Sequence, residues 1–127
     1  MKILVVGKGG REHALALACS KSQLCTALYA APGNPGMAKF ATCVDISDSD
    51  IDALVTFAQE NEIDLTVVGP EATLALGIVD AFQAKGLKIF GPTQAATQVE
   101  SSKDFAKKIM AKYHIPTAAY QTFDQLE

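Results

Sequence analysis

The chain has 127 residues, of which 49% are hydrophobic and 20% are charged, and its formal net charge is −3. This composition predicts a globular chain with a buried core and excludes a disordered one. The net negative charge disfavours nucleic acid as a partner, and no apolar stretch approaches the length of a membrane span, which argues against a membrane partner.

The three cysteines contain no Cys-x-x-Cys pair, and they are spread through apolar sequence at Cys19, Cys25 and Cys43. We interpret them as buried thiols in a reducing compartment. The expected location is therefore the cytoplasm.

The first predicted unit is a strand, a tight turn and a helix. Residues 3–6 are long or branched aliphatics without polar alternation, which is typical of a parallel strand buried on both faces. Gly7, Gly9 and Gly10 follow, and an apolar helix begins near Arg11. Glycines let another group approach the backbone, and the N–H groups of a helix start favour an anion. The alternative is a tight turn without a ligand.

Further strands and helices alternate along the chain. Together they predict an α/β fold, an open parallel Rossmann-like sheet of about five strands with flanking helices, followed by a C-terminal helical segment. Strands are expected over residues 26–31, 42–46, 65–68 and 87–90, helices over 51–60, 72–85, 94–100 and 102–113, and residues 118–123 are a candidate edge strand.

Glycine and proline mark the loops after four of the strands, at residues 7–11, 32–36, 69–71 and 91–93. In a parallel α/β sheet, ligands bind outside the carboxyl ends of the strands. These four loops are therefore expected to face one crevice.

A dinucleotide fits this crevice poorly. The third glycine of the dinucleotide fingerprint would stand at position 12, where the chain has Glu12, and the end of the second strand, residues 29–34, carries no acidic residue for a ribose. A phosphate monoester fits better, because Lys8, Arg11 and His13 lie close to the first helix start.

Two of the polar residues also have a structural interpretation. Glu71 can accept hydrogen bonds from an amine or from sugar hydroxyls, but an acidic residue is also favoured at a helix N-terminus. His13 is a candidate for phosphate contact or for a structural hydrogen bond in the first helical turn. No cluster with metal-ligand spacing and no nucleophile motif is present in the sequence.

The motifs as a set resemble the N-terminal part of the phosphoribosylamine–glycine ligases, or glycinamide ribonucleotide synthetases, a family of the ATP-grasp superfamily. The likeness covers the whole chain in order. The motifs are Gly7-Lys8-Gly9-Gly10-Arg11-Glu12-His13-Ala14, Ala31-Pro32-Gly33-Asn34-Pro35-Gly36, Val67-Val68-Gly69-Pro70-Glu71-Ala72, Phe90-Gly91-Pro92-Thr93, Ser102-Lys103-x-Phe105-Ala106-Lys107 and Ile115-Pro116-Thr117-Ala118.

The resemblance implies a ligase of purine biosynthesis that uses ATP with magnesium or manganese to join glycine to 5-phosphoribosylamine, giving glycinamide ribonucleotide, ADP and phosphate. It implies that Gly9, Gly10 and Arg11 seat the phosphoribosylamine. Residues Gly69, Pro70 and Glu71 would border its ribose or amine, and Lys103 would reach the nucleotide. It assigns no catalytic residue and no metal ligand to this chain.

The sequence also departs from the family pattern. Lys8 stands where a small residue is usual, and Thr73 where proline is usual. We expect a substrate-side α/β domain over residues 1–100, then a linker helix and the start of a truncated ATP-grasp domain over 101–127. Without the ATP-grasp and C-terminal domains, the chain is expected to bind no cofactor and to be inactive alone. The alternative is a free-standing Rossmann-like module that binds a sugar phosphate or a nucleotide.

Overall fold

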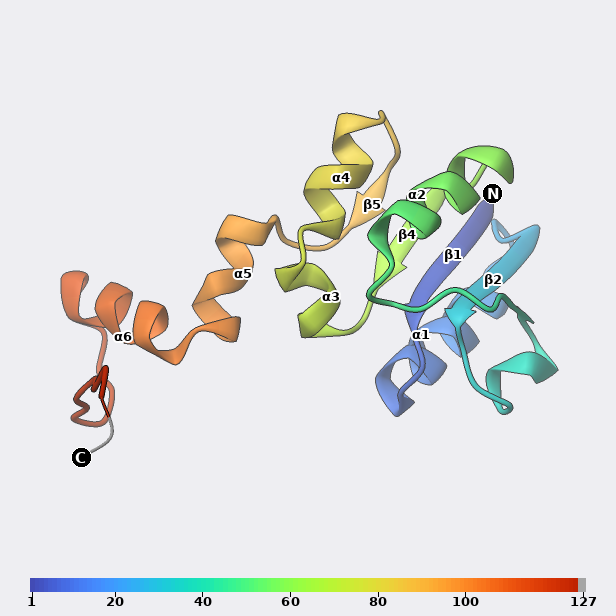
Figure 1. The fold of residues 1–127 in the computed structure, drawn as a ribbon. Helices are drawn as coiled ribbons and strands as arrows, with labels where there is room; N and C mark the ends of the chain where they lie inside the picture. Colours follow the sequence, from blue (N-terminus) through green and yellow to red (C-terminus); the bar gives the residue numbers. More distant parts are fainter. Residues whose placement is uncertain (126–127) are drawn as a thin grey trace.

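The computed structural model describes residues 1–125 and contains a five-stranded, all-parallel sheet with the strand order β3-β2-β1-β4-β5. This confirms the α/β prediction. The elements in chain order are β1 (Lys2–Gly7), α1 (Gly10–Ser20), β2 (Ala27–Pro32), the 3₁₀ helix η1 (Met37–Lys39), β3 (Thr42–Cys43), α2 (Ile51–Glu60), β4 (Leu65–Val68), α3 (Glu71–Ala75), α4 (Ile78–Ala84), β5 (Ile89–Phe90), α5 (Gln94–Ser101) and α6 (Lys103–Lys112) (Figure 1).

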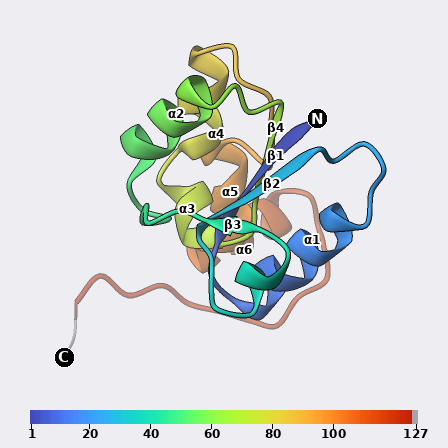
Figure 2. The ribbon, with the colours of Figure 1, turned by 90° about the vertical axis from the view of Figure 1, so that its right-hand side faces the viewer.

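Helices cover both faces of the sheet, which is why β1 is aliphatic without alternation. Leu4 and Val6 pack with side chains of α2 and α4, whereas Ile3 and Val5 pack with Ala16 of α1. Figure 2 shows α1 on one side of the strands and α2 and α4 on the other. All four of these strand residues are 5% exposed or less.

The strand order reverses at β1. The chain runs from β1 outward through β2 to β3, then returns to place β4 on the other side of β1. The carboxyl ends of β1 and β4 therefore form the switch point at which open α/β sheets bind ligands.

The predicted helix over residues 72–85 is wrong as a single element. Gly77 adopts a left-handed conformation, with φ of +87°, and divides the segment into α3 and α4. A side chain at this φ would be strained, so the glycine permits the change of direction. No helix within residues 1–125 is long and apolar enough to cross a membrane.

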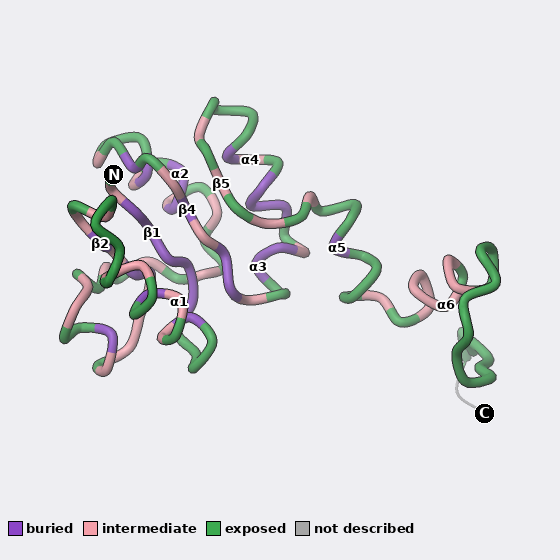
Figure 3. The backbone as a smooth tube through the Cα atoms, turned by 180° about the vertical axis from the view of Figure 1, so that it is seen from behind, coloured by how far each residue is buried: buried purple, intermediate pink, exposed green. Residues whose placement is uncertain are grey.

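The C-terminal part differs from the sequence expectation in two ways. Residues 118–123 form no strand and pair with none of the five strands. Figure 1 shows this tail beside α6, away from the sheet. The helix expected over residues 102–113 is present as α6, but none of its residues is buried, and Tyr113, just after the helix, is 64% exposed. Figures 1 and 3 show α5 and α6 extending away from the sheet, with α6 exposed or half-buried along its length.

Candidate functional site

The turn between β1 and α1 is closed by a side chain of its own helix. Gly7 has φ of +128°, and Gly9 is the N-cap of α1. The Gly9 N–H donates to Glu12 Oε2 at 2.7 Å. The Gly-x-x-Glu spacing, which resembles a helix capping box, was the sequence signal for this bond. Sequence reasoning treated Glu12 only as an obstacle to pyrophosphate and missed it.

The turn between β4 and α3 lies beside the first turn. The Gly69 N–H donates to the Val6 carbonyl of β1 at 3.2 Å, which extends the strand pairing into the turn. The Arg11 guanidinium donates to the Gly69 carbonyl at 2.9 Å through Nη1, and its Nη2 lies 3.6 Å from Glu71 Oε1. A cation from one turn and an anion from the other are thus held side by side.

These two turns line a pocket of about 490 Å³. Its lining contains five of the six residues predicted to bind substrate, and Gly69 is tied to it through Arg11. Glu71 is also the first residue of α3, so both interpretations of this residue fit its position. The lining residues are Gly9, Gly10, Arg11, Glu12, Pro70, Glu71 and Ala72.

The loop after β2 braces the first turn from its other side. The Gly33 N–H donates to the Gly7 carbonyl at 3.1 Å, and Asn34 Nδ2 donates to the Lys8 carbonyl at 3.0 Å. The His13 ring packs edge-on against Phe40, with a centroid distance of 5.5 Å. This is a packing contact and not the structural hydrogen bond expected from the sequence. Neither this loop nor His13 of α1 lines the pocket.

The loop over residues 91–93 also contributes no lining residue. Its Thr93 side chain accepts from the Ala96 N–H at 3.3 Å and caps α5. The expectation that four loops face one crevice is therefore correct for the loops after β1 and β4. The loop after β2 instead bonds to the first glycine turn, and the loop after β5 caps α5.

Lys103, the residue predicted to reach ATP, lies elsewhere. It is the first residue of α6 and lines a separate pocket of about 300 Å³ with Asp104, Lys107 and residues 120–122. Figure 1 shows α6 away from the turns that follow β1 and β4, and Lys103 is absent from the lining of the pocket between those turns.

A divalent metal has no evident site in the part of the chain that the structure describes. No group of three or more His, Cys, Asp or Glu side chains within residues 1–125 could hold an ion. The magnesium or manganese implied by the resemblance therefore does not fit these residues.

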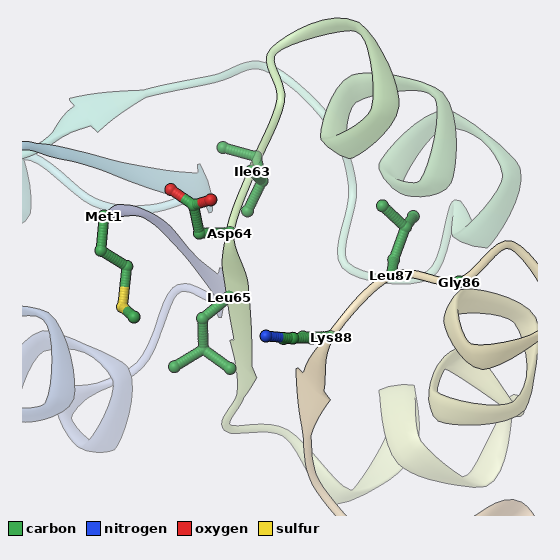
Figure 4. Close-up of a pocket in the computed structure, with 7 residues that line it drawn as sticks. All are labelled: Met1, Ile63, Asp64, Leu65, Gly86, Leu87 and Lys88. Atoms are coloured by element: carbon green, nitrogen blue, oxygen red, sulfur yellow. The ribbon is translucent and has the colours of Figure 1, made fainter.

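A second pocket, of about 480 Å³, lies at the opposite ends of the strands, near Met1, Asp64 and Lys88 (Figure 4). Two of its charged groups already make hydrogen bonds within the protein. Asp64 accepts from the Lys2 N–H at 2.7 Å, and the Met1 ammonium donates to the Leu24 carbonyl at 2.8 Å. The two pockets have nearly the same volume. The position at the switch point and the Arg11–Glu71 pair favour the first pocket as the ligand site.

The chain is similar to known proteins over its whole length. Residues 1–100 match the family model described as phosphoribosylglycinamide synthetase, N domain. Over its full length, the chain is 54% identical to a phosphoribosylamine–glycine ligase from Pasteurella multocida and 53% identical to one from Caldanaerobacter subterraneus. It spans 30% of the length of each of these relatives.

Solved structures agree with the fold. A phosphoribosylamine–glycine ligase from Thermotoga maritima superimposes with a TM-score of 0.65 at 26% identity, covering 94% of this chain and 26% of the other. The N5-carboxyaminoimidazole ribonucleotide synthetase of the same organism gives a TM-score of 0.71 at 19% identity, covering 99% and 34% respectively. At that identity the second likeness concerns the fold alone.

Proposed function

The chain belongs to the phosphoribosylglycinamide synthetase N-domain family, and we propose that it forms the substrate side of an ATP-dependent ligase joining glycine to 5-phosphoribosylamine. The products are glycinamide ribonucleotide, ADP and phosphate. One observation carries the proposal: Arg11 and Glu71 stand together at the switch point, the guanidinium held by the Gly69 carbonyl.

The substrate 5-phosphoribosylamine carries a dianionic phosphate at one end and an amine at the other. Arg11 suits the phosphate, because a guanidinium has five N–H donors and only one is used on Gly69. The Arg11 and Glu71 side chains are 59% and 46% exposed and 3.6 Å apart, so their own attraction is weak. Both side chains can therefore still form hydrogen bonds and ion pairs with a ligand.

In the proposed reaction, ATP transfers its terminal phosphoryl group to the glycine carboxylate. The amine nitrogen then attacks the acyl carbon, the C–N bond forms, the C–O bond to phosphate breaks and the nitrogen loses a proton. Glu71 accepts a hydrogen bond from the amine or a ribose hydroxyl and orients the nucleophile, while Gly9, Gly10 and Pro70 shape the pocket wall.

We assign ATP and its metal ion to the portion of the ligase outside the 30% that this chain spans. Lys103, exposed at the start of α6, is the residue proposed to extend toward the nucleotide. The three free thiols support the proposed cytoplasmic location.

The test is calorimetric titration of the chain with ribose 5-phosphate, NAD and AMP. Ribose 5-phosphate should bind best, and Arg11→Ala should weaken it about tenfold or more, since a charge-assisted hydrogen bond contributes about 1.5–3 kcal/mol. Lys21→Ala is the control, because it removes an exposed cation at the C-terminal end of α1 that does not line the pocket. Tighter binding of NAD, or an unchanged affinity in Arg11→Ala, would contradict the proposal.

A kinetic test separates the ligase from the alternative binding module. The chain alone should form no ADP from ATP, glycine and 5-phosphoribosylamine. Within a complete ligase that carries this chain, Arg11→Ala should raise the KM for 5-phosphoribosylamine more than the KM for ATP. Equal KM values in variant and parent would make Arg11 a structural residue.

A further inference from the structure

The carboxylate of Glu12 is buried inside the two turns that form the pocket. The residue is 5% exposed, although it carries an acidic side chain. Its Oε2 accepts the Gly9 N–H at 2.7 Å. Acidic residues are rarely buried this deeply without a specific partner, and here the partner is the backbone of the glycine turn.

The glycines of both turns provide the space for this side chain. A Cβ atom at Gly69 would overlap Glu12 Oε1, and a Cβ atom at Gly7 would overlap its Cγ. A Cβ atom at Gly9 would lie 2.9 Å from Oε2. Gly69 belongs to the β4–α3 turn and the other two to the β1–α1 turn, so one side chain fills the gap between them.

We propose that Glu12 is the positioning and specificity-determining residue of this pocket. Its carboxylate occupies the anion position of the glycine turn and fixes the first turn of α1 against Gly69. Arg11 is the preceding residue, so the same contact sets the direction from which its guanidinium reaches the Gly69 carbonyl.

The substrate class follows from this arrangement. In the dinucleotide fingerprint, the glycine turn approaches a pyrophosphate and its third glycine lets the helix pack closely. Here the third position is Glu12 and the Gly9 N–H is already bonded, so a substrate anion is held outside the turn by Arg11. The pocket therefore selects a phosphate monoester over a pyrophosphate, a selection that rests on the proposed function.

The positioning role is tested by a double-mutant cycle of thermal stability on Glu12→Ala, Gly69→Ala and the double variant. Gly69→Ala should lower the Tm by about 5 °C or more, because its methyl group collides with the buried carboxylate. The same change should cost little in the Glu12→Ala background. Additive Tm shifts would overturn the positioning role whatever the chain binds.

The specificity role is tested by calorimetry with ribose 5-phosphate and inorganic pyrophosphate. Glu12→Gln keeps an acceptor oxygen and the side-chain shape, and it should retain the preference for ribose 5-phosphate. Glu12→Gly restores the third glycine, and it should shift the affinity ratio at least tenfold toward pyrophosphate. An unchanged ratio in Glu12→Gly would overturn the specificity role.

The two tests fail separately. If the parent chain binds neither ligand, the proposed function fails while the cycle still decides whether Glu12 positions the turns. If Glu12→Gly does not fold, Glu12→Ala decides the specificity role: a shift of the affinity ratio toward pyrophosphate supports it, and an unchanged ratio overturns it.

Discussion

The three thiols differ in their surroundings more than the sequence indicated. Cys19 and Cys25 are half-buried, but Cys43 is exposed, which corrects the interpretation of all three as buried. The difference arises because β3 is a two-residue edge strand with both residues exposed. Burial raises the pKa of the Cys19 thiol, and the neighbouring Cys25 raises it further.

The thiols should therefore react in a defined order. A raised pKa leaves less thiolate at a given pH, so Cys19 should react with Ellman's reagent at pH 8 at least about tenfold more slowly than Cys43. Stopped-flow absorbance measures the phases. Cys43→Ser should remove the fast phase and Cys19→Ser should leave it, and the reverse pattern would show that β3 is covered in solution.

The interior strand β4, between β1 and β5, contains a hydroxyl group without a hydrogen bond. Thr66 is 1% exposed, and its hydroxyl has no hydrogen-bond partner within residues 1–125. Burying a hydroxyl without a partner costs about 1–3 kcal/mol. Thr66→Val, which keeps the side-chain shape, should therefore raise the free energy of unfolding by about 1 kcal/mol.

The matched control for this prediction is Thr97→Val in α5. Thr97 is also buried, but its hydroxyl donates to the Thr93 carbonyl at 2.8 Å. That substitution should lower the free energy of unfolding by about 1 kcal/mol, because it removes a bond that is made. Urea unfolding of both variants provides the measurement, and a loss of stability in Thr66→Val would mean that its hydroxyl has a partner in solution.

The elements that the sequence predicts best are those whose neighbours are all apolar. Residues 3–6 are predicted as a strand and lie within β1, because burial on both faces leaves a continuous aliphatic run. The break at Gly77 was missed, since Leu74 and Ile78 continue the helical spacing across it. Only the backbone angle of the glycine reveals the change of direction.

The pocket, too, is predictable from the sequence only in part. Arg11 and Glu71 could be brought together from sequence, because the carboxyl ends of adjacent parallel strands meet at one edge. The bond from Gly9 to Glu12 depends on how the first turn of α1 closes, and the distance of Lys103 from this pocket depends on where α5 directs the chain. The Gly-x-x-Glu spacing indicates the bond without fixing its geometry, and no pattern in the sequence indicates the position of Lys103.

At the scale of the whole molecule, burial divides the chain unevenly. Within residues 1–125, every buried residue lies at or before Thr97, in the sheet, its helices and the loops between them. Residues 102–125, which form α6 and the tail that follows it, contain no buried residue (Figure 3). Segments with few buried apolar contacts open locally at low free energy. The domain boundary near residue 100 remains a prediction, and this uneven burial makes it testable.

Limited trypsin digestion should therefore cut first in α6. The helix contains Lys103, Lys107, Lys108 and Lys112, and none of its residues is buried. Mass spectrometry should find an early product that begins at Met1 and ends at one of these lysines. The control sites are Lys39 and Lys85, which lie beside the sheet in segments anchored by buried Met37 and Phe82.

The thermal stability of that product measures how much α6 contributes to the stability of the sheet. A chain of residues 1–102 keeps α5, in which the hydroxyl of the buried Thr97 donates to the Thr93 carbonyl. Among the residues that the structure describes, it loses only exposed or half-buried ones, at 103–125. Its Tm should stay within about 5 °C of the parent, a difference of about 1 kcal/mol or less for a domain of this size. Early cleavage at Lys39 or Lys85, or a much lower Tm, would place α6 within the same cooperative unit as the sheet.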